Sequence, residues 1–188
     1  GPALGTVVHN ALEEMLHKSR TPDHTPTLLP PETIAHRLDA AEDALDREDP
    51  TSVSRSEQVS AVRRMLTTFR DSRLFAEACS AETLYTEYPF VWNQWPGDAP
   101  QTADDAPTIL RGFIDLVYRD STGWHIVDYK TDRIASPSDV QSLSDDHPYA
   151  QQVRLYAAAW RACTGMSVAD AGLWFAETDT VARVDVAP

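Results

Sequence analysis

Two aspartates and a lysine lie in neighbouring segments that are rich in β-forming residues. Asp115 lies within residues 108–118, and Asp128 and Lys130 lie within residues 124–131. Asp128 and Lys130 are two positions apart, so on a strand they share a face at a separation of roughly 6.6 Å. Two carboxylates on adjacent strands can hold a hard cation such as Mg²⁺. A lysine beside them can contact a phosphate or help activate a water molecule.

The same three residues also have a purely structural interpretation. In the first strand, Leu110, Ile114 and Leu116 share one face, which is typical of a core, and Asp115 lies on the other face. Asp115 is then an exposed or salt-bridged carboxylate. Asp128 and Lys130 form a surface ladder of the kind that contributes little to stability. The spacing alone leaves both interpretations open.

The elements around these residues follow from periodicity. Apolar residues recur at helical spacing in 4–18, 32–47, 56–78 and 147–163, and β-forming residues dominate 82–92, 108–118, 124–131, 170–176 and 181–186. Asp120–Gly123 predicts a hairpin turn, and Gly165 predicts the end of the last helix. The order predicts an α/β or α+β fold with a mixed sheet flanked by helices. We expect one domain over 1–188, with a helical part at 3–80 and a sheet-containing part at 81–188.

The composition restricts the class of protein. A formal charge of −13 argues against a free DNA-binding protein, which usually carries a basic face. The two cysteines cannot hold a metal cluster alone, and they fit a reducing cytoplasm. The sequence has neither a secretory signal pattern nor an apolar run of membrane-spanning length. Gly1-Pro2 resembles a protease-cleavage scar, so we expect a piece of a longer protein.

Five ordered segments carry a resemblance to a known family. They are Gly5–Glu13 (G-x-x-x-H-x-x-L-E), Glu87–Phe90 (E-x-P-F), Gly112–Asp115, Ile126–Thr131 and Tyr149–Tyr156 (Y-x-x-Q-L-x-x-Y, with Val153 in place of Leu). This set resembles the PD-(D/E)xK nuclease superfamily, whose core is like that of the restriction endonucleases. More narrowly, it is similar to the nuclease domain at the C-termini of RecB- and AddA-type helicase–nucleases.

The resemblance implies a role for each matching residue. His9 would join Asp115 and Asp128 as a metal ligand, Tyr129 would offer its backbone carbonyl to the metal, and Lys130 would be the catalytic lysine. Tyr149, Gln152 and Tyr156 would border the site and position the substrate, with Glu87 nearby. The residues alone also allow a structural interpretation of each position. His9 can be a packing residue, and Glu87 can be an ordinary strand carboxylate. The three residues at 149, 152 and 156 can form a half-polar helix face.

The resemblance also implies a function. It predicts a Mg²⁺- or Mn²⁺-dependent deoxyribonuclease, without the iron–sulfur cluster that one four-cysteine subgroup carries. The substrate would be single-stranded DNA in repair and recombination, delivered by a helicase in the same polypeptide, and the resemblance allows for a second subunit. A DNA groove would be lined by Arg111, Lys130, Arg133 and Arg154. The alternatives are a catalytically silent structural or DNA-guiding module and a stand-alone repair nuclease.

Overall fold

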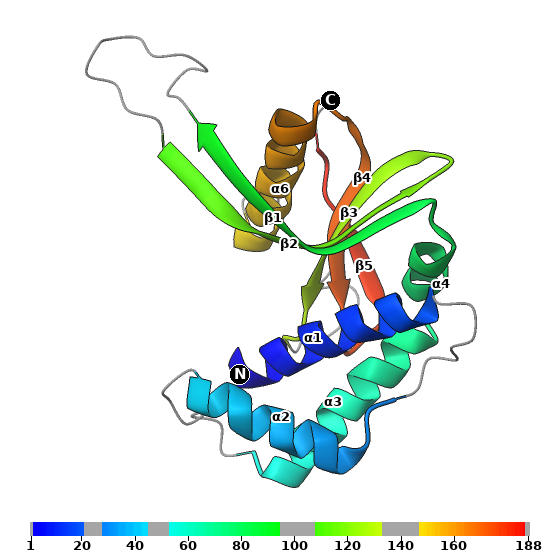
Figure 1. Ribbon diagram of the computed structural model, residues 1–188, viewed down its shortest axis with the longest axis vertical. Helices are drawn as coiled ribbons and strands as arrows, with labels where there is room; N and C mark the ends of the chain where they lie inside the picture. The colour runs from blue at the N-terminus through cyan, green and yellow to red at the C-terminus, as the bar shows by residue number, and fades with distance from the viewer. Residues whose placement is uncertain (1, 21–27, 45–52, 95–107, 133–146, 187–188) are drawn as a thin grey trace. The chain divides into compact units, whose positions relative to one another are not determined.

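The computed structural model describes residues 2–20, 28–44, 53–94, 108–132 and 147–186. They belong to two compact units (Figure 1). The first unit comprises Gly1–Ala81, Tyr129–Ser142 and Trp174–Ala182, and the second comprises Glu82–Asp128, Leu143–Leu173 and Arg183–Pro188. The chain therefore crosses from the second unit to the first between two bonded residues, Asp128 and Tyr129. The prediction of a single domain over 1–188 stays a prediction.

The first unit is built on four helices. They are α1 (Pro2–Ser19), α2 (Pro31–Ala44), α3 (Arg55–Arg70) and α4 (Arg73–Ser80). Their shared core contains Val8, Leu12, Leu38, Leu66 and Phe69, each with no exposed surface. Phe69 also packs edge-on against Tyr129 and Trp174, at 5.7 and 5.1 Å between ring centroids. None of the described helices is both long and apolar enough to cross a membrane.

The prediction of one continuous helix over 56–78 is wrong, because the chain breaks at Asp71 and Ser72. Asp71 is the C-cap of α3, and the buried Ser72 is the N-cap of α4. The Ser72 hydroxyl accepts a hydrogen bond from the Phe75 backbone N–H at 3.1 Å and donates one to the Phe69 carbonyl at 2.6 Å. Serine side chains readily form hydrogen bonds with backbone groups at helix ends. Ser72 therefore bonds to the last turn of α3 and caps the first turn of α4.

The strands form one five-stranded sheet in the order β1-β2-β3-β4-β5. Their bounds are β1 (Thr83–Gln94), β2 (Thr108–Asp120), β3 (Gly123–Lys130), β4 (Val168–Phe175) and β5 (Thr180–Arg183). β2 pairs antiparallel with both β1 and β3. The arrows of β3 and β4 point the same way (Figure 1), with the helix α6 (Pro148–Thr164) between them in the chain. The prediction of a mixed sheet flanked by helices is confirmed.

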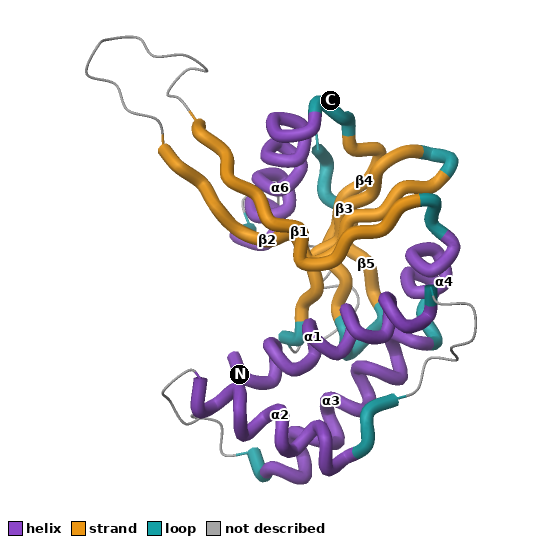
Figure 2. The backbone as a smooth tube through the Cα atoms, viewed as in Figure 1, coloured by secondary structure: helices purple, strands orange, loops and turns teal. Residues whose placement is uncertain are grey.

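In the second unit, α6 lies against β1, as the tube in Figure 2 also shows. Tyr88 packs edge-on against Trp160, and Phe90 against Tyr156, with centroid separations of 5.2 and 5.8 Å. Gly112 on β2 lies beneath the Phe90 ring, where an added Cβ would come within 3.1 Å of it. This packing fixes one face of α6 on the strands that carry Glu87 and Asp115. Gly165 ends α6 with a φ of 72°, as predicted.

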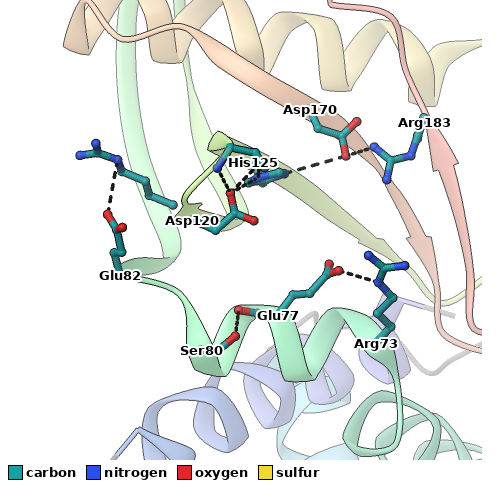
Figure 3. A network of polar contacts seen from close by, with 10 residues as sticks. Arg73, Glu77, Ser80, Glu82, Asp120, His125, Asp170 and Arg183 are labelled. Atoms are coloured by element: carbon teal, nitrogen blue, oxygen red, sulfur yellow. Dashed lines mark hydrogen bonds and ion pairs between the residues drawn. The ribbon is translucent and has the colours of Figure 1, made fainter.

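A polar network ties the β2–β3 hairpin to β4 in the same unit (Figure 3). His125 Nε2 lies 3.0 Å from Asp120, and its Nδ1 lies 3.9 Å from Asp170, which also pairs with Arg183. The imidazole stacks on the Tyr118 ring with centroids 4.7 Å apart. The network joins residues of four strands, β2, β3, β4 and β5.

Candidate active site

Asp115 and Asp128 are buried in the second unit, with 8% and 2% of their surface exposed. The last paired residues of β2 and β3 are Leu116 and Val127, so the next position in that register sets Asp115 opposite Asp128. Residues opposite one another in an antiparallel pair share a face, with Cα atoms about 4.5–5.5 Å apart. The interpretation of these aspartates as surface residues is therefore wrong.

Glu87 extends this arrangement to a third strand. Thr86 pairs with Leu116 and Tyr88 with Ile114, so the register between them sets Glu87 opposite Asp115. A carboxylate oxygen of Glu87 lies within 4.8 Å of one of Asp115. Glu87, Asp115 and Asp128 thus lie at one level on three neighbouring strands, and we call them the acidic row. Like charges directly opposite one another destabilise a sheet unless a cation or proton offsets them.

The backbone of Glu87 is distorted at this point. Its φ is +46°, in the left-handed region that a residue with a Cβ seldom adopts. The register is the same on both sides of Glu87, so no extra residue has been inserted into the strand. Such a conformation costs on the order of 1–3 kcal/mol and persists only where the surroundings enforce it. Strain of this kind is commonly found at functional sites.

Tyr156 on α6 brings a phenol to the acidic row. The side chain is 8% exposed, and Gln152, one helical turn earlier, donates an Nε2 hydrogen bond to its hydroxyl at 2.7 Å. Burial, followed by the negative charge of Asp128 and with smaller effects of Asp115 and Glu87, raises the pKa of Tyr156 to about 12, against the lowering effect of the Gln152 hydrogen bond. The phenol therefore keeps its proton at neutral pH and can donate it in a hydrogen bond.

Tyr149 differs from its two helix neighbours in its contacts. It lies in the first turn of α6, where its backbone N–H donates to Nδ1 of the N-cap residue His147 at 3.2 Å. Its ring packs against the His147 ring with centroids 4.8 Å apart. These contacts pack Tyr149 against the N-cap of α6. Its predicted contact with the substrate stays a prediction.

His9, Tyr129 and Lys130 belong to the first unit, whereas the predicted groove residues Arg111 and Arg154 belong to the second. His9 is half-buried on α1, and its ring packs edge-on against the Tyr129 ring with centroids 5.6 Å apart. Tyr129 is 3% exposed, so its ring is held in the aromatic core around Phe69. The carbonyl of the half-buried Lys130 accepts a hydrogen bond from the Ala176 N–H at 2.9 Å. Arg133, predicted to line a groove, lies outside the described residues.

Sequence reasoning missed part of this site. It placed Glu87 only near the site, whereas the register puts it in line with both aspartates. It also missed Arg63 and Arg64 of α3, which line a hollow together with Ala176. The first omission could not have been avoided, because residues 95–107 separate β1 from β2 and leave the register of Glu87 open. The second could not have been avoided either, because the arginines and Ala176 are more than a hundred residues apart.

Comparison with known proteins places the chain in a family. It matches the PD-(D/E)XK nuclease superfamily over residues 1–186. Proteins named as one subunit of an ATP-dependent helicase/nuclease are 33% identical over 129 residues in Carboxydothermus hydrogenoformans and 42% identical over 64 residues in Staphylococcus epidermidis. These alignments cover 65% and 34% of this chain, but only 11% and 5% of the relatives, so the chain spans a small part of their length. The resemblance to helicase–nucleases is thereby confirmed, and the chain belongs to the PD-(D/E)XK nuclease superfamily.

Proposed function

We propose that this chain is a metal-dependent nuclease that hydrolyses phosphodiester bonds in DNA. In this proposal His9, Asp115, Asp128 and the backbone carbonyl of Tyr129 hold Mg²⁺ or Mn²⁺, and Lys130 assists the reaction. The observation that carries it is the acidic row, in which carboxylates of three adjacent strands lie at one level with both aspartates buried. Burial of several like charges is costly, and coordination of a metal ion is one of the ways in which proteins compensate it.

The acidic row offers oxygen ligands of the kind that the proposed cation prefers, with Glu87 beside the proposed ligand Asp115. Mg²⁺ prefers oxygen ligands at 2.0–2.1 Å and retains several waters. Two ligands of one ion are then separated by at most about 4.2 Å, twice that bond length, and the Glu87 and Asp115 oxygens lie within 4.8 Å. A small adjustment of either side chain brings both within range of one ion. When bound, the metal neutralises charge on the phosphate and lowers the pKa of the attacking water.

The residues of the chain have separate tasks in this proposal. The ammonium group of Lys130 binds an oxygen of the scissile phosphate and stabilises the charge that develops on it. Tyr156 remains protonated, and because Gln152 is the donor in their hydrogen bond, the phenol hydrogen is available to a substrate oxygen. The packing of Phe90 on Tyr156 holds that ring in place. The phenol therefore serves as a fixed donor at the edge of the site.

The test is a cleavage assay on labelled single-stranded and duplex DNA with Mg²⁺, Mn²⁺ or excess chelator. We expect cleavage with either metal, none with chelator, and none from a folded Asp128→Asn variant. Asp185→Asn is the matched control, because Asp185 is an exposed aspartate beyond the end of β5. Cleavage by the Asp128→Asn variant at the wild-type rate would reject the assignment. No cleavage by the folded wild-type chain with either metal would favour the silent, DNA-guiding module.

We further propose that a helicase in the same polypeptide delivers single-stranded DNA to this site during repair and recombination in the cytoplasm. The net charge of −13 supports delivery, because such a chain repels DNA over roughly 8 Å at physiological salt. A tethered motor replaces free encounter by a high effective concentration. The 188-residue chain should therefore cleave single strands much more slowly than the full-length protein. Equal rates would favour a stand-alone nuclease instead.

A further inference from the structure

A hollow of about 360 Å³ lies in the first unit, between α3 and the chain that follows β4. It is lined by Arg63, Arg64, Met65, Thr67, Thr68, Ala176 and Glu177. The four polar residues of α3 share one helix face, because their spacing is i, i+1, i+4 and i+5. The volume lies within the range of about 300–1,000 Å³ that is typical of ligand sites.

The two arginines differ from most others in this acidic chain. Arg37, Arg55, Arg70, Arg73, Arg119 and Arg183 each form an ion pair with a carboxylate. Within the part of the chain that the structure describes, no ion pair or side-chain hydrogen bond engages the guanidinium groups of Arg63 and Arg64. Both side chains are exposed. With Glu177 as the single acidic residue of the lining, the hollow carries a net positive charge.

The hollow adjoins the residue that is proposed to act on the phosphate. Ala176 lines it, and the Ala176 N–H donates to the Lys130 carbonyl at 2.9 Å. The contact lies within the first unit, so the backbone of Lys130 is one hydrogen bond away from a residue that lines the hollow. A strand whose scissile phosphate lies at Lys130 has further phosphates along its backbone that need a partner.

We propose that the Arg63–Arg64 hollow binds a phosphate of the DNA strand beside the one that is cleaved. Arginine suits this task because its planar guanidinium forms paired hydrogen bonds to phosphate oxygens and is always charged. The Thr68 hydroxyl supplies a further donor on the same face. This inference rests on the proposed nuclease function, and it gives the chain a local DNA contact despite its overall negative charge.

The experiment compares two double variants that lose the same charge. Arg63→Gln/Arg64→Gln removes the hollow's cations, and Arg70→Gln/Arg73→Gln removes two arginines that are paired with Asp71 and Glu77. Binding of a labelled single-stranded oligonucleotide is measured in chelator over a range of salt. We expect the first variant to bind about tenfold more weakly. Its log–log salt dependence should be shallower by about 0.7, which is the change expected for the loss of one phosphate contact on a single strand. The second variant should stay within about twofold of the wild type.

Two results would overturn this inference. If both variants weaken binding equally, the effect is one of net charge and the hollow has no special role. If inorganic phosphate or a mononucleotide competes as well as the unlabelled strand does, the hollow is a site for free anions. Urea unfolding of each variant establishes that the fold is intact.

Steady-state kinetics of cleavage distinguish a failure of this inference from a failure of the proposed nuclease function. With active protein, Arg63→Gln/Arg64→Gln should raise KM about tenfold and leave kcat within about twofold, because the lost contact binds substrate and transition state alike. A fall in kcat with unchanged KM would contradict the assignment as a binding site. If the wild-type chain cleaves nothing under any condition, the nuclease proposal fails, and the binding comparison still decides the role of the hollow.

Discussion

Glu87 of β1 and Asp115 of β2 are opposed across an otherwise regular antiparallel pair, with carboxylate oxygens within 4.8 Å of one another. The residues on either side keep the ladder register, while Glu87 adopts a φ of +46°. The pair combines electrostatic repulsion with backbone strain at the position where the proposed chemistry needs a cation. Removal of either carboxylate should therefore have opposite effects on folding and on metal binding.

Glu87→Gln tests the repulsion directly. In excess chelator, we expect the variant to melt about 2–4 °C above the wild type, which corresponds to roughly 1 kcal/mol for a chain of this size. Added Mg²⁺ should raise the wild-type midpoint more than the midpoint of the variant, because a bound cation offsets the repulsion that the variant lacks. Differential scanning fluorimetry with a Mg²⁺ titration provides the measurement. A variant that is less stable than the wild type in chelator would show that Glu87 is held by attractive contacts.

Removal of the groups proposed to act in the reaction should abolish activity and preserve the fold. Asp115→Asn, Asp128→Asn and Lys130→Ala should each lower kcat/KM at least about 10³-fold, which is roughly 4 kcal/mol of transition-state stabilisation. Circular dichroism and urea unfolding check the fold. Retention of a tenth or more of the wild-type activity by any one of them would remove that residue from the catalytic set.

Tyr156→Phe separates a positioning role from a packing role. The ring and its contact with Phe90 remain, while the hydrogen-bond acceptor of Gln152 is lost, so we expect about a tenfold loss of kcat at neutral pH with a near-normal KM.

The raised pKa of Tyr156 also predicts a change in stability at alkaline pH. Because burial and then Asp128 raise its pKa to about 12, the unfolded chain ionises first, and the free energy of unfolding should fall between pH 10 and 12. The phenylalanine variant should lack that part of the decrease, and an identical alkaline profile in both proteins would contradict the shift.

The raised pKa of His125 predicts that the free energy of unfolding depends on pH near neutrality. Asp170 and then Asp120 raise the pKa of His125 against the opposing effect of burial. The protonated form is thus favoured in the folded chain, so its contribution is complete below pH 6.5 and is lost as the pH rises through the folded-state pKa. The difference in free energy of unfolding between the wild type and His125→Gln should therefore shrink from pH 6 to pH 8. A difference between the two proteins that stays constant from pH 6 to pH 8 would contradict the raised pKa of His125.

The sequence predicted the β2–β3 half of the acidic row because a two-residue turn sets that register. Asp120 pairs with Gly123, and counting back five residues from Asp120 and forward five from Gly123 brings Asp115 opposite Asp128. The same count fails for Glu87, because residues 95–107 separate β1 from β2 and leave several registers open. The positive φ of Glu87 is likewise set by tertiary context and has no signal in the sequence.

The missed break between α3 and α4 has a different cause. Phe69, Leu74 and Phe75 continue the apolar spacing across the junction, so periodicity predicted one helix. Ser72 interrupts the helix in spite of this periodicity. Its hydroxyl accepts a hydrogen bond from the Phe75 backbone N–H and caps the start of α4. The Arg63–Arg64 hollow was missed because it needs the chain after β4 to meet α3, and long-range proximity of this kind is not encoded in spacing.

The left-handed backbone at position 87 has an evolutionary consequence. Glycine reaches that conformation without steric cost, so drift governed by folding alone would favour glycine there. Such a change would also remove a negative charge opposite Asp115, giving a second gain in stability. We therefore predict that a lineage keeps a carboxylate at this position, despite both advantages, where the proposed reaction requires it. Homologous sequences with glycine at 87 should therefore come from lineages in which the nuclease activity has decayed.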